Sequence, residues 1–166
     1  MNGSITSEMA ALVPRLRRFA YALAADREEG DDIVQTACMK ALSRLDQFEP
    51  GTRLDSWMFR IVQTTFLDHR RQQGRRSIVA LDAEDAAFSD GGYAMRRAEN
   101  RAELDRVRAA MASLAEDQRS VLTLVAIEGF SYRETAEILS LPVGTVMSRL
   151  SRARQRLLAL MAEGAA

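Results

Sequence analysis

The chain has 166 residues, 47% of them hydrophobic and 28% charged, and its 23 basic and 23 acidic residues leave no net charge. This composition is typical of one folded domain or two small ones, and it excludes a disordered chain. A zero sum does not exclude a nucleic-acid partner, because the distribution of charge decides such binding. The single cysteine, Cys38, excludes a disulfide framework and a thiolate metal cluster, so we expect no cofactor or metal.

Gly and Pro are scarce, whereas Ala, Leu, Arg and Met are plentiful, which favours an all-α fold. No apolar run approaches the length that crosses a membrane. The stretch "MNGSITSEMAALVPRLRRFA" has no apolar core followed by a cleavage site. We therefore expect a cytoplasmic protein without membrane insertion.

The first half of the sequence predicts three helices. Apolar residues at helical spacing predict the first over residues 7–24, where Pro14 favours a bend. A polar break follows, and Asp31 and Asp32 then suit the positive end of a second helix. The apolar face of the second helix is expected to comprise Ile33, Val34, Ala37, Cys38, Ala41, Leu42 and Leu45.

A Pro-Gly pair predicts a loop before the third helix, which runs from Asp55 or Ser56 to about Gln73. Its core face is expected to comprise Trp57, Met58, Ile61, Val62 and Phe66. Its C-terminal part is basic, with Arg60, Arg70, Arg71, Arg75 and Arg76. Cations suit a helix C-terminus, but five arginines in this segment exceed what capping requires.

The composition changes at residue 77. The next stretch, residues 77–95, has no basic side chain, a Gly-Gly pair and the acids Asp82, Glu84, Asp85 and Asp90. These features predict a flexible acidic linker, residues 77–97, between a domain of residues 1–76 and a second of residues 98–166. A linker whose charge serves solubility alone explains the composition as well as a specific role does.

The second domain begins with a predicted helix near Ala98 and a short helix in "EDQRSVLTLVAIEG". In the short helix Val121, Leu122, Val125 and Ala126 are expected to point inward, and Gly129 is expected to end it.

The segment "FSYRETAEILSLPVGTVMSRL" has the layout of a helix-turn-helix. Ser131 followed by Glu134 forms a capping box that starts a helix running to Ile138 or Leu139. "LSLP" makes the turn, and Pro142 suits the first turn of the next helix.

That next helix has two different faces. The apolar seam comprises Val146, Leu150, Ala153, Leu157 and Leu160. The other side carries Thr145, Ser148, Arg149, Arg152 and Arg156, and Arg154 is a further arginine in the later part of the helix. Such a helix can enter the major groove of DNA, where Ser148 and Arg149 are placed to read base edges. The later arginines suit phosphates. An ordinary amphipathic surface helix is the alternative, and the lack of acids over residues 141–161 argues against it.

Taken in order, these segments resemble the extracytoplasmic-function (ECF) group of bacterial sigma factors. "DDIVQTACMKALSRLDQF" is similar to the family's polymerase-binding helix, and "RLDSWMFRIVQTTFLDHRRQQGRR" is similar to its promoter-melting segment. "LAEDQRSVLTLVAIEGFSYRETAEILSLPVGTVMSRLSRARQRL" resembles region four. Two such blocks joined by a linker are more specific than any single motif.

The resemblance implies a mechanism in which region two, about residues 7–76, docks on the clamp helices of the polymerase β′ subunit. The matching exposed positions are Asp32, Gln35, Thr36, Met39 and Lys40. The basic helix and Thr64 would hold the downstream (−10) promoter element, and the loop of residues 48–56 would capture a flipped base. Region four would read the upstream (−35) element and bind the β flap. The linker would lie in the path that RNA takes through the polymerase. An anti-sigma factor would control the protein.

Three positions depart from the family pattern. Thr36 stands where a glutamate is common, Thr64 where an asparagine often lines the base pocket, and Met147 where an arginine or lysine is frequent.

Three other classes of protein compete with this interpretation. A helix-turn-helix repressor would show a dimer seam or a ligand pocket, and the sequence indicates neither. A sigma-like decoy that only binds an anti-sigma factor would lose its recognition arginines or carry a receiver domain. An enzyme is rejected, because no catalytic carboxylate pair, nucleophile–histidine set or phosphate loop is present.

Overall fold

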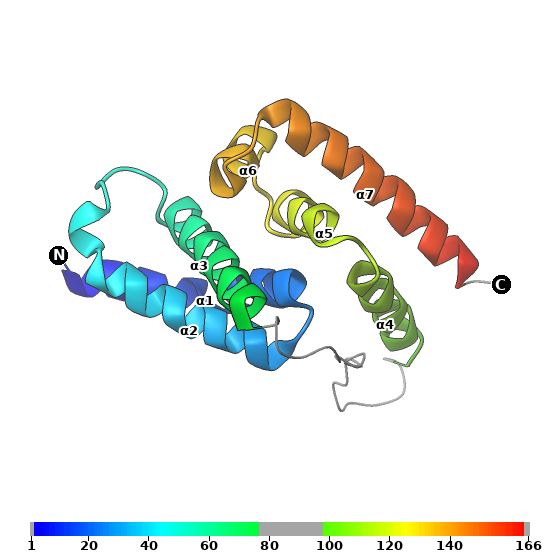
Figure 1. Cartoon of the computed structure of the whole chain (residues 1–166), viewed down its shortest axis with the longest axis horizontal. Helices are drawn as coiled ribbons and strands as arrows, with labels where there is room; N and C mark the ends of the chain where they lie inside the picture. Colours follow the sequence, from blue (N-terminus) through cyan, green and yellow to red (C-terminus); the bar gives the residue numbers. More distant parts are fainter. Residues whose placement is uncertain (1, 77–97, 165–166) are drawn as a thin grey trace.

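The computed structural model describes residues 2–76 and 98–164, and every regular element in these ranges is helical (Figure 1). The first domain comprises α1 (Asn2–Ala24), α2 (Arg27–Ser43), the 3-10 turn η1 (Leu45–Gln47) and α3 (Leu54–Arg76). The second comprises α4 (Ala98–Ala112), α5 (Glu116–Leu122), the π-helical turn η3 (Thr123–Ile127), α6 (Tyr132–Leu139) and α7 (Val143–Glu163). The predicted all-α class with two helical domains is confirmed, while the predicted linker lies outside the described residues. None of these helices combines the length and apolar character that a bilayer span requires.

The first domain is a three-helix unit in which α1, α2 and α3 pack against one another. Leu16, Phe19 and Leu23 of α1 are almost fully enclosed and share one face of the helix. The helix begins at Asn2 rather than at residue 7, because Ile5 and Met9 continue the same apolar stripe towards the N-terminus. The predicted core helix is therefore correct in position but too short.

Helix α2 also begins earlier than its acidic residues predict. Asp26 is the N-cap, and its carboxylate accepts hydrogen bonds from the backbone N–H groups of Glu28 at 2.7 Å and Glu29 at 3.2 Å. A side-chain cap fixes the first turn at its own position, so the helix starts at Arg27 and not at Asp31.

Gly30 lies where α2 passes closest to α1. A Cβ atom at this position would lie 2.5 Å from Tyr21 Cδ1 and 3.3 Å from the Tyr21 backbone nitrogen. Real Cβ atoms do not approach other atoms so closely, so the crossing of the two helices depends on a residue without a side chain.

The second domain contains a π-helical turn that changes which side chains face inward. The Glu128 N–H donates to the Thr123 carbonyl, five residues back, at 2.9 Å. Because the wider turn shifts the helical register, Leu124 is fully buried, whereas Ala126, which was expected to point inward, is exposed. Gly129, with φ of 77°, follows η3 as the predicted stop.

The two domains pack directly against each other. Helix α6 lies against α3, while α5 and η3 lie against α1 (Figure 1). Buried apolar side chains from both domains form one continuous cluster. The domains therefore form a closed arrangement, which the sequence did not predict.

Candidate nucleic-acid and polymerase interfaces

The helix-turn-helix is built as its capping box predicts. Ser131 Oγ accepts a hydrogen bond from the Glu134 N–H at 3.1 Å, and Glu134 Oε2 accepts one from the Ser131 N–H at 2.7 Å. The bond from the Ser131 N–H is the main reason why the pKa of Glu134 lies below its usual value. Helix α6 ends at Ser140, whose left-handed backbone (φ 54°, ψ 48°) turns the chain towards Pro142 and α7.

Helix α7 separates its apolar and cationic sides. Val146, Leu150 and Ala153 are buried, and Leu157 and Leu160 pack against the core, so the predicted seam is confirmed. The side chains exposed on the helix include Ser148, Arg152, Arg154 and Arg156. One side of the helix thus builds the domain, and the other presents positive charge to solvent.

Arg149 is held differently from the other arginines of α7. It is half-buried, and its Nε lies 3.5 Å from Asp117 Oδ2 at the start of α5. One turn before it, Thr145 is also half-buried, and its carbonyl accepts a hydrogen bond from Ser148 Oγ at 3.1 Å. Arg149 is therefore engaged with its own domain, unlike the exposed Arg152, Arg154 and Arg156.

Helix α3 carries a second group of basic side chains. Those exposed to solvent are Arg60, Arg71 and Arg75. Thr64 is also exposed, and its Oγ1 donates to the Ile61 carbonyl at 3.1 Å. The side chain of Arg76, the last residue of α3, lies outside the description.

Arg70 differs from its neighbours, because acids from both domains surround it. It lies 3.8 Å from Glu29 of α2 and 3.8 Å from Glu116 of α5. Its guanidinium also lies over the Phe66 ring, 5.1 Å from the centroid. In this closed arrangement Arg70 is half-buried and contributes to packing between the domains.

The outer face of α2 presents the five positions that resemble the polymerase-binding set. Asp32, Gln35 and Thr36 are exposed, Met39 is 64% exposed, and Lys40 pairs with Asp68 at 3.2 Å. Leu42, which was predicted to face the core, is instead 49% exposed. It lies one position beyond the buried Ala41, and successive helical residues turn by about 100°. Met39 and Leu42 therefore leave large apolar side chains on an otherwise polar face.

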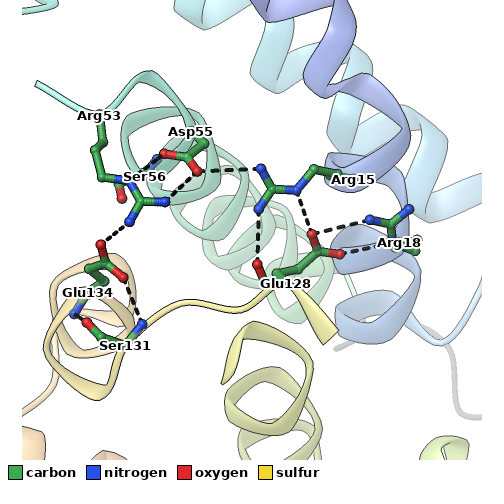
Figure 2. Close-up of polar contacts among 8 residues, drawn as sticks. All are labelled: Arg15, Arg18, Arg53, Asp55, Ser56, Glu128, Ser131 and Glu134. Atoms are coloured by element: carbon green, nitrogen blue, oxygen red, sulfur yellow. Dashed lines mark hydrogen bonds and ion pairs between the residues drawn. The ribbon is translucent and has the colours of Figure 1, made fainter. Parts of the chain in front are cut away.

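Glu128 connects the two domains. Its carboxylate accepts hydrogen bonds from Arg15 Nε at 2.8 Å and Arg18 Nε at 3.0 Å, and its side chain has no exposed surface (Figure 2). Its backbone carbonyl accepts a further bond from Arg15 Nη2 at 3.2 Å. A carboxylate from the second domain is thus enclosed between two guanidinium groups of the first.

A second connection involves Arg53, the residue before α3. Arg53 pairs with Asp55 at 2.7 Å and with Glu134 of α6, while Arg15 also reaches Asp55 at 3.4 Å (Figure 2). Burial tends to raise the pKa of Asp55, but hydrogen bonds from Arg53, the Ser56 N–H and Arg15 outweigh it and lower this pKa. The hydrogen bond to Asp55 in turn raises the pKa of Arg53.

These residues form what we call the interdomain charge cluster, which comprises Arg15, Arg18, Arg53, Asp55, Glu128 and Glu134. The first domain contributes three arginines and one aspartate, a formal charge of +2, and the second contributes two glutamates, a charge of −2. The cluster is neutral only while the domains are together.

Arg119 of α5 makes a third connection without a carboxylate. Its buried guanidinium donates to the carbonyls of Ala22 and Leu23 near the end of α1. It also donates to those of Ala112, the last residue of α4, and Leu114, two residues later. Burial lowers the pKa of this arginine. Positive charge at a helix C-terminus suits the dipole, so one side chain stabilises the ends of helices in both domains.

Sequence reasoning missed this whole set of contacts between the domains. The sequence predicts only an ordinary short helix around Arg119, and the predicted core omits Phe59, which is fully buried. The available signal was Arg119 itself, one helical turn before the buried Thr123 and beside the buried Ser120 and Val121. A charged residue at such a position indicates a hydrogen-bonded burial rather than solubility.

A helix-turn-helix with a cationic outer face, preceded by a second basic helix, defines a DNA-binding protein of the transcription class. The family model described as "Sigma-70 region 2" matches residues 9–76, and "Sigma-70, region 4" matches residues 104–157. The ECF RNA polymerase sigma factor EcfG of Rhodopseudomonas palustris is 37% identical over 97% of this chain and 87% of its own. The Escherichia coli ECF sigma-E factor is 36% identical over 75% of this chain and 69% of its own. The chain belongs to the ECF sigma factors.

Solved structures agree with this assignment. The sigma factor RpoE from Bartonella quintana, in complex with the anti-sigma factor NepR, has a TM-score of 0.83. It is 32% identical, and the match covers 96% of this chain and 97% of that one. CnrH in complex with the cytosolic domain of CnrY has a TM-score of 0.69 at 28% identity, over 98% and 90% of the two chains.

Proposed function

We propose that this protein binds core RNA polymerase and directs it to specific promoters. Residues 1–76 act as the region 2 domain and residues 98–166 as the region 4 domain, with residues 77–97 as the linker. Membership of the ECF sigma factors supports the activity, and the surfaces described above support the distribution of roles. The protein supplies recognition, and the polymerase supplies the chemistry.

The outer face of α2 is the proposed site for the β′ clamp helices. Exposed Met39 and Leu42 offer apolar surface towards the C-terminal end of the helix, and Asp32, Gln35 and Lys40 offer polar contacts beside it. Protein interfaces commonly combine an apolar centre with a polar rim. This face is uncovered in the closed arrangement, so polymerase can reach it there.

The DNA contacts are proposed for α7 and α3. The observation that carries the proposal is the exposed side of α7, where Arg152, Arg154 and Arg156 face solvent without an acid paired to them in the described part of the chain. These arginines suit phosphates of the −35 element, and Thr145, Ser148 and Arg149 suit base edges. On α3, Arg60, Thr64, Arg71 and Arg75, with Arg70 and Arg76, are proposed to hold the −10 element.

Control by an anti-sigma factor is the third part of the proposal. Support comes from the RpoE structure, which contains the anti-sigma factor NepR, and from the CnrH structure, in which the protein is bound to the cytosolic domain of CnrY. A partner of this kind would act by covering the polymerase or DNA surfaces of both domains. On the polymerase itself, the β flap is the proposed partner of the second domain.

Run-off transcription from a genomic library, with core polymerase and the purified full chain, tests the function. We expect new start sites that share two spaced promoter elements. If core polymerase with the protein initiates at no site that core polymerase alone does not use, the proposal is wrong.

A further inference from the structure

We propose that the interdomain charge cluster is an autoinhibitory latch, which keeps the free protein closed and stops it from contacting both promoter elements at once. This inference rests on the proposed function for the positions of the two DNA-reading parts. It goes beyond that function, because it assigns an inhibitory role to contacts within the chain itself, without any partner.

The first argument is the distance between the two DNA-reading parts. The −10 and −35 elements lie about 25 base pairs apart, which is about 85 Å at about 3.4 Å per base pair. In the closed arrangement Arg53, on the loop proposed to capture the melted base, contacts Glu134 of α6, the first helix of the helix-turn-helix. Parts that touch through an ion pair cannot reach two elements so far apart on one duplex.

The second argument is that the latch occupies the groups that DNA would need. Arg53 lies on the proposed base-capture loop, and Glu134 and Asp55 neutralise its charge. Glu116 of α5 likewise approaches Arg70, which lies on α3, the helix proposed to hold the −10 element. Carboxylates of the second domain thus stand beside arginines that would otherwise face phosphates.

The third argument is that the contact is a built interface. The Glu128 side chain has no exposed surface and accepts from both Arg15 and Arg18, and Arg119 is buried with four carbonyl acceptors. A carboxylate enclosed in this way needs its partners, because an unpaired buried charge is strongly unfavourable. The residues between the domains, 77–97, could span about 70 Å when extended, which leaves room for the domains to part.

The latch leaves the proposed clamp-binding face of α2 open. Closed protein therefore binds the β′ clamp helices normally, and the inhibited step is the later engagement of promoter DNA. This separation distinguishes the latch from a partner that covers the polymerase surface.

A reversible cross-link gives the decisive test. The variant Arg18→Cys/Glu128→Cys, which replaces an interdomain pair outside the proposed DNA and polymerase surfaces, is made in the full chain with Cys38→Ser and joined by a short cleavable bismaleimide. We expect the joined protein to bind a purified β′ clamp fragment as the uncross-linked variant does, but to lose promoter-directed transcription by about tenfold or more. Cleavage of the linker restores transcription. If joined and cleaved protein transcribe equally, the latch is wrong, whereas failure of the uncross-linked variant and the unaltered chain to direct polymerase overturns the proposed function instead.

A second experiment measures the latch in the free protein. Spin labels at Ser43→Cys and Ser151→Cys, both exposed positions, report the distance between the domains in the Cys38→Ser chain. We expect one narrow distribution of distances, which Glu128→Lys broadens and shifts to longer values. Glu103→Lys, at an exposed position on α4, should change nothing. Glu134→Gln gives a milder opening with the capping box kept, because glutamine serves at that position. If about nine tenths of the protein is closed, full opening raises the apparent affinity of the complex of protein and core polymerase for promoter DNA about tenfold. A distribution that is already long and broad in the unaltered chain refutes the latch.

Discussion

Phe59 of α3 and Phe130, which precedes α6, meet edge to face with ring centroids 5.0 Å apart, although they belong to different domains. Both rings are buried, and Phe59 also contacts Phe19 of α1 at 5.4 Å. The Arg15 guanidinium lies 5.3 Å from the Phe59 centroid, so the apolar contact and the interdomain charge cluster adjoin. The domains are therefore joined by an apolar centre as well as by charges.

Removal of the Phe130 ring is expected to destabilise the protein strongly. Phe130→Ala should lower the free energy of unfolding by about 3–5 kcal/mol, because it leaves a cavity beside Phe59. Urea denaturation followed by circular dichroism measures the change. Leu158→Ala, at a side chain that is 71% exposed, is the control and should stay within about 0.5 kcal/mol. A loss below about 1 kcal/mol in Phe130→Ala would mean that the contact between the domains is not maintained in solution.

Two helical glycines should respond oppositely to the same substitution. Gly30→Ala forces a Cβ against Tyr21, and we expect a net loss of about 1–3 kcal/mol despite the better helix propensity of alanine. Gly74→Ala, with no atom within 4 Å of the new Cβ, should gain about 0.5–1 kcal/mol. Thermal unfolding of the two variants side by side tests the prediction. Equal shifts of the two melting temperatures would contradict the close crossing of α1 and α2.

Arg149 is expected to contribute to promoter reading and not to polymerase binding. Arg149→Ala should weaken promoter-specific binding by about 1–3 kcal/mol while affinity for core polymerase is unchanged. The measurement is transcription from a promoter found by the run-off screen, with every base of its −35 element varied. Arg108→Ala on α4 is the control. Unchanged preference at all −35 positions would show that another residue reads these bases.

The outer face of α2 should determine affinity for polymerase. Asp32→Ala combined with Gln35→Ala removes two exposed polar groups, and we expect about a tenfold weaker interaction with purified core enzyme. Titration of labelled protein with core polymerase measures the affinity. Glu103→Ala, exposed on the other domain, should bind as the unaltered chain does. Equal affinity of the double variant would move the docking site elsewhere.

Acid should weaken the folded protein. The folded-state pKa values of Asp55 and Glu134 lie below those of free side chains, which are about 3.9 and about 4.3. Carboxylates with lowered pKa values stabilise the folded state fully above the unfolded pKa, and the contribution is lost as pH falls through the folded value. Stability should therefore decline below about pH 5. In Asp55→Asn/Glu134→Gln, the free energy of unfolding should decline less steeply between neutral and acidic pH than in the unaltered chain. If the two proteins show the same slope, these two groups are not the cause.

The sequence predicted features that depend on neighbours along the chain. The capping box of Ser131 and Glu134, the seam of α7 and the stop at Gly129 each follow from residues within a few turns of one another. The inward position of Ala126 was predicted wrongly, because a π-helical turn is not visible in a helical repeat.

Contacts between the domains could not be predicted in the same way. Arg15 and Glu128 are 113 residues apart, and Arg53 and Glu134 are 81 apart, so no local pattern relates them. Arg119 binds backbone carbonyls, which every residue type carries, and its acceptors leave no mark in the sequence. The surfaces for DNA and polymerase stay predictions from the sequence, whereas the mutual arrangement of the helices that carry them required the three-dimensional structure.

The four carbonyl acceptors of Arg119 also bear on how the domains separate. Two belong to the first domain and two to the second, and all are held by one planar guanidinium. If one domain slid slightly along the other, the Arg119 hydrogen bonds to one domain would break before water could reach the freed carbonyls. Leaving these buried polar groups without a partner is energetically costly. Intermediate, partly parted geometries are thus disfavoured, and the transition is expected to be abrupt. Lysine, which lacks the planar fork, could not hold the same four oxygens.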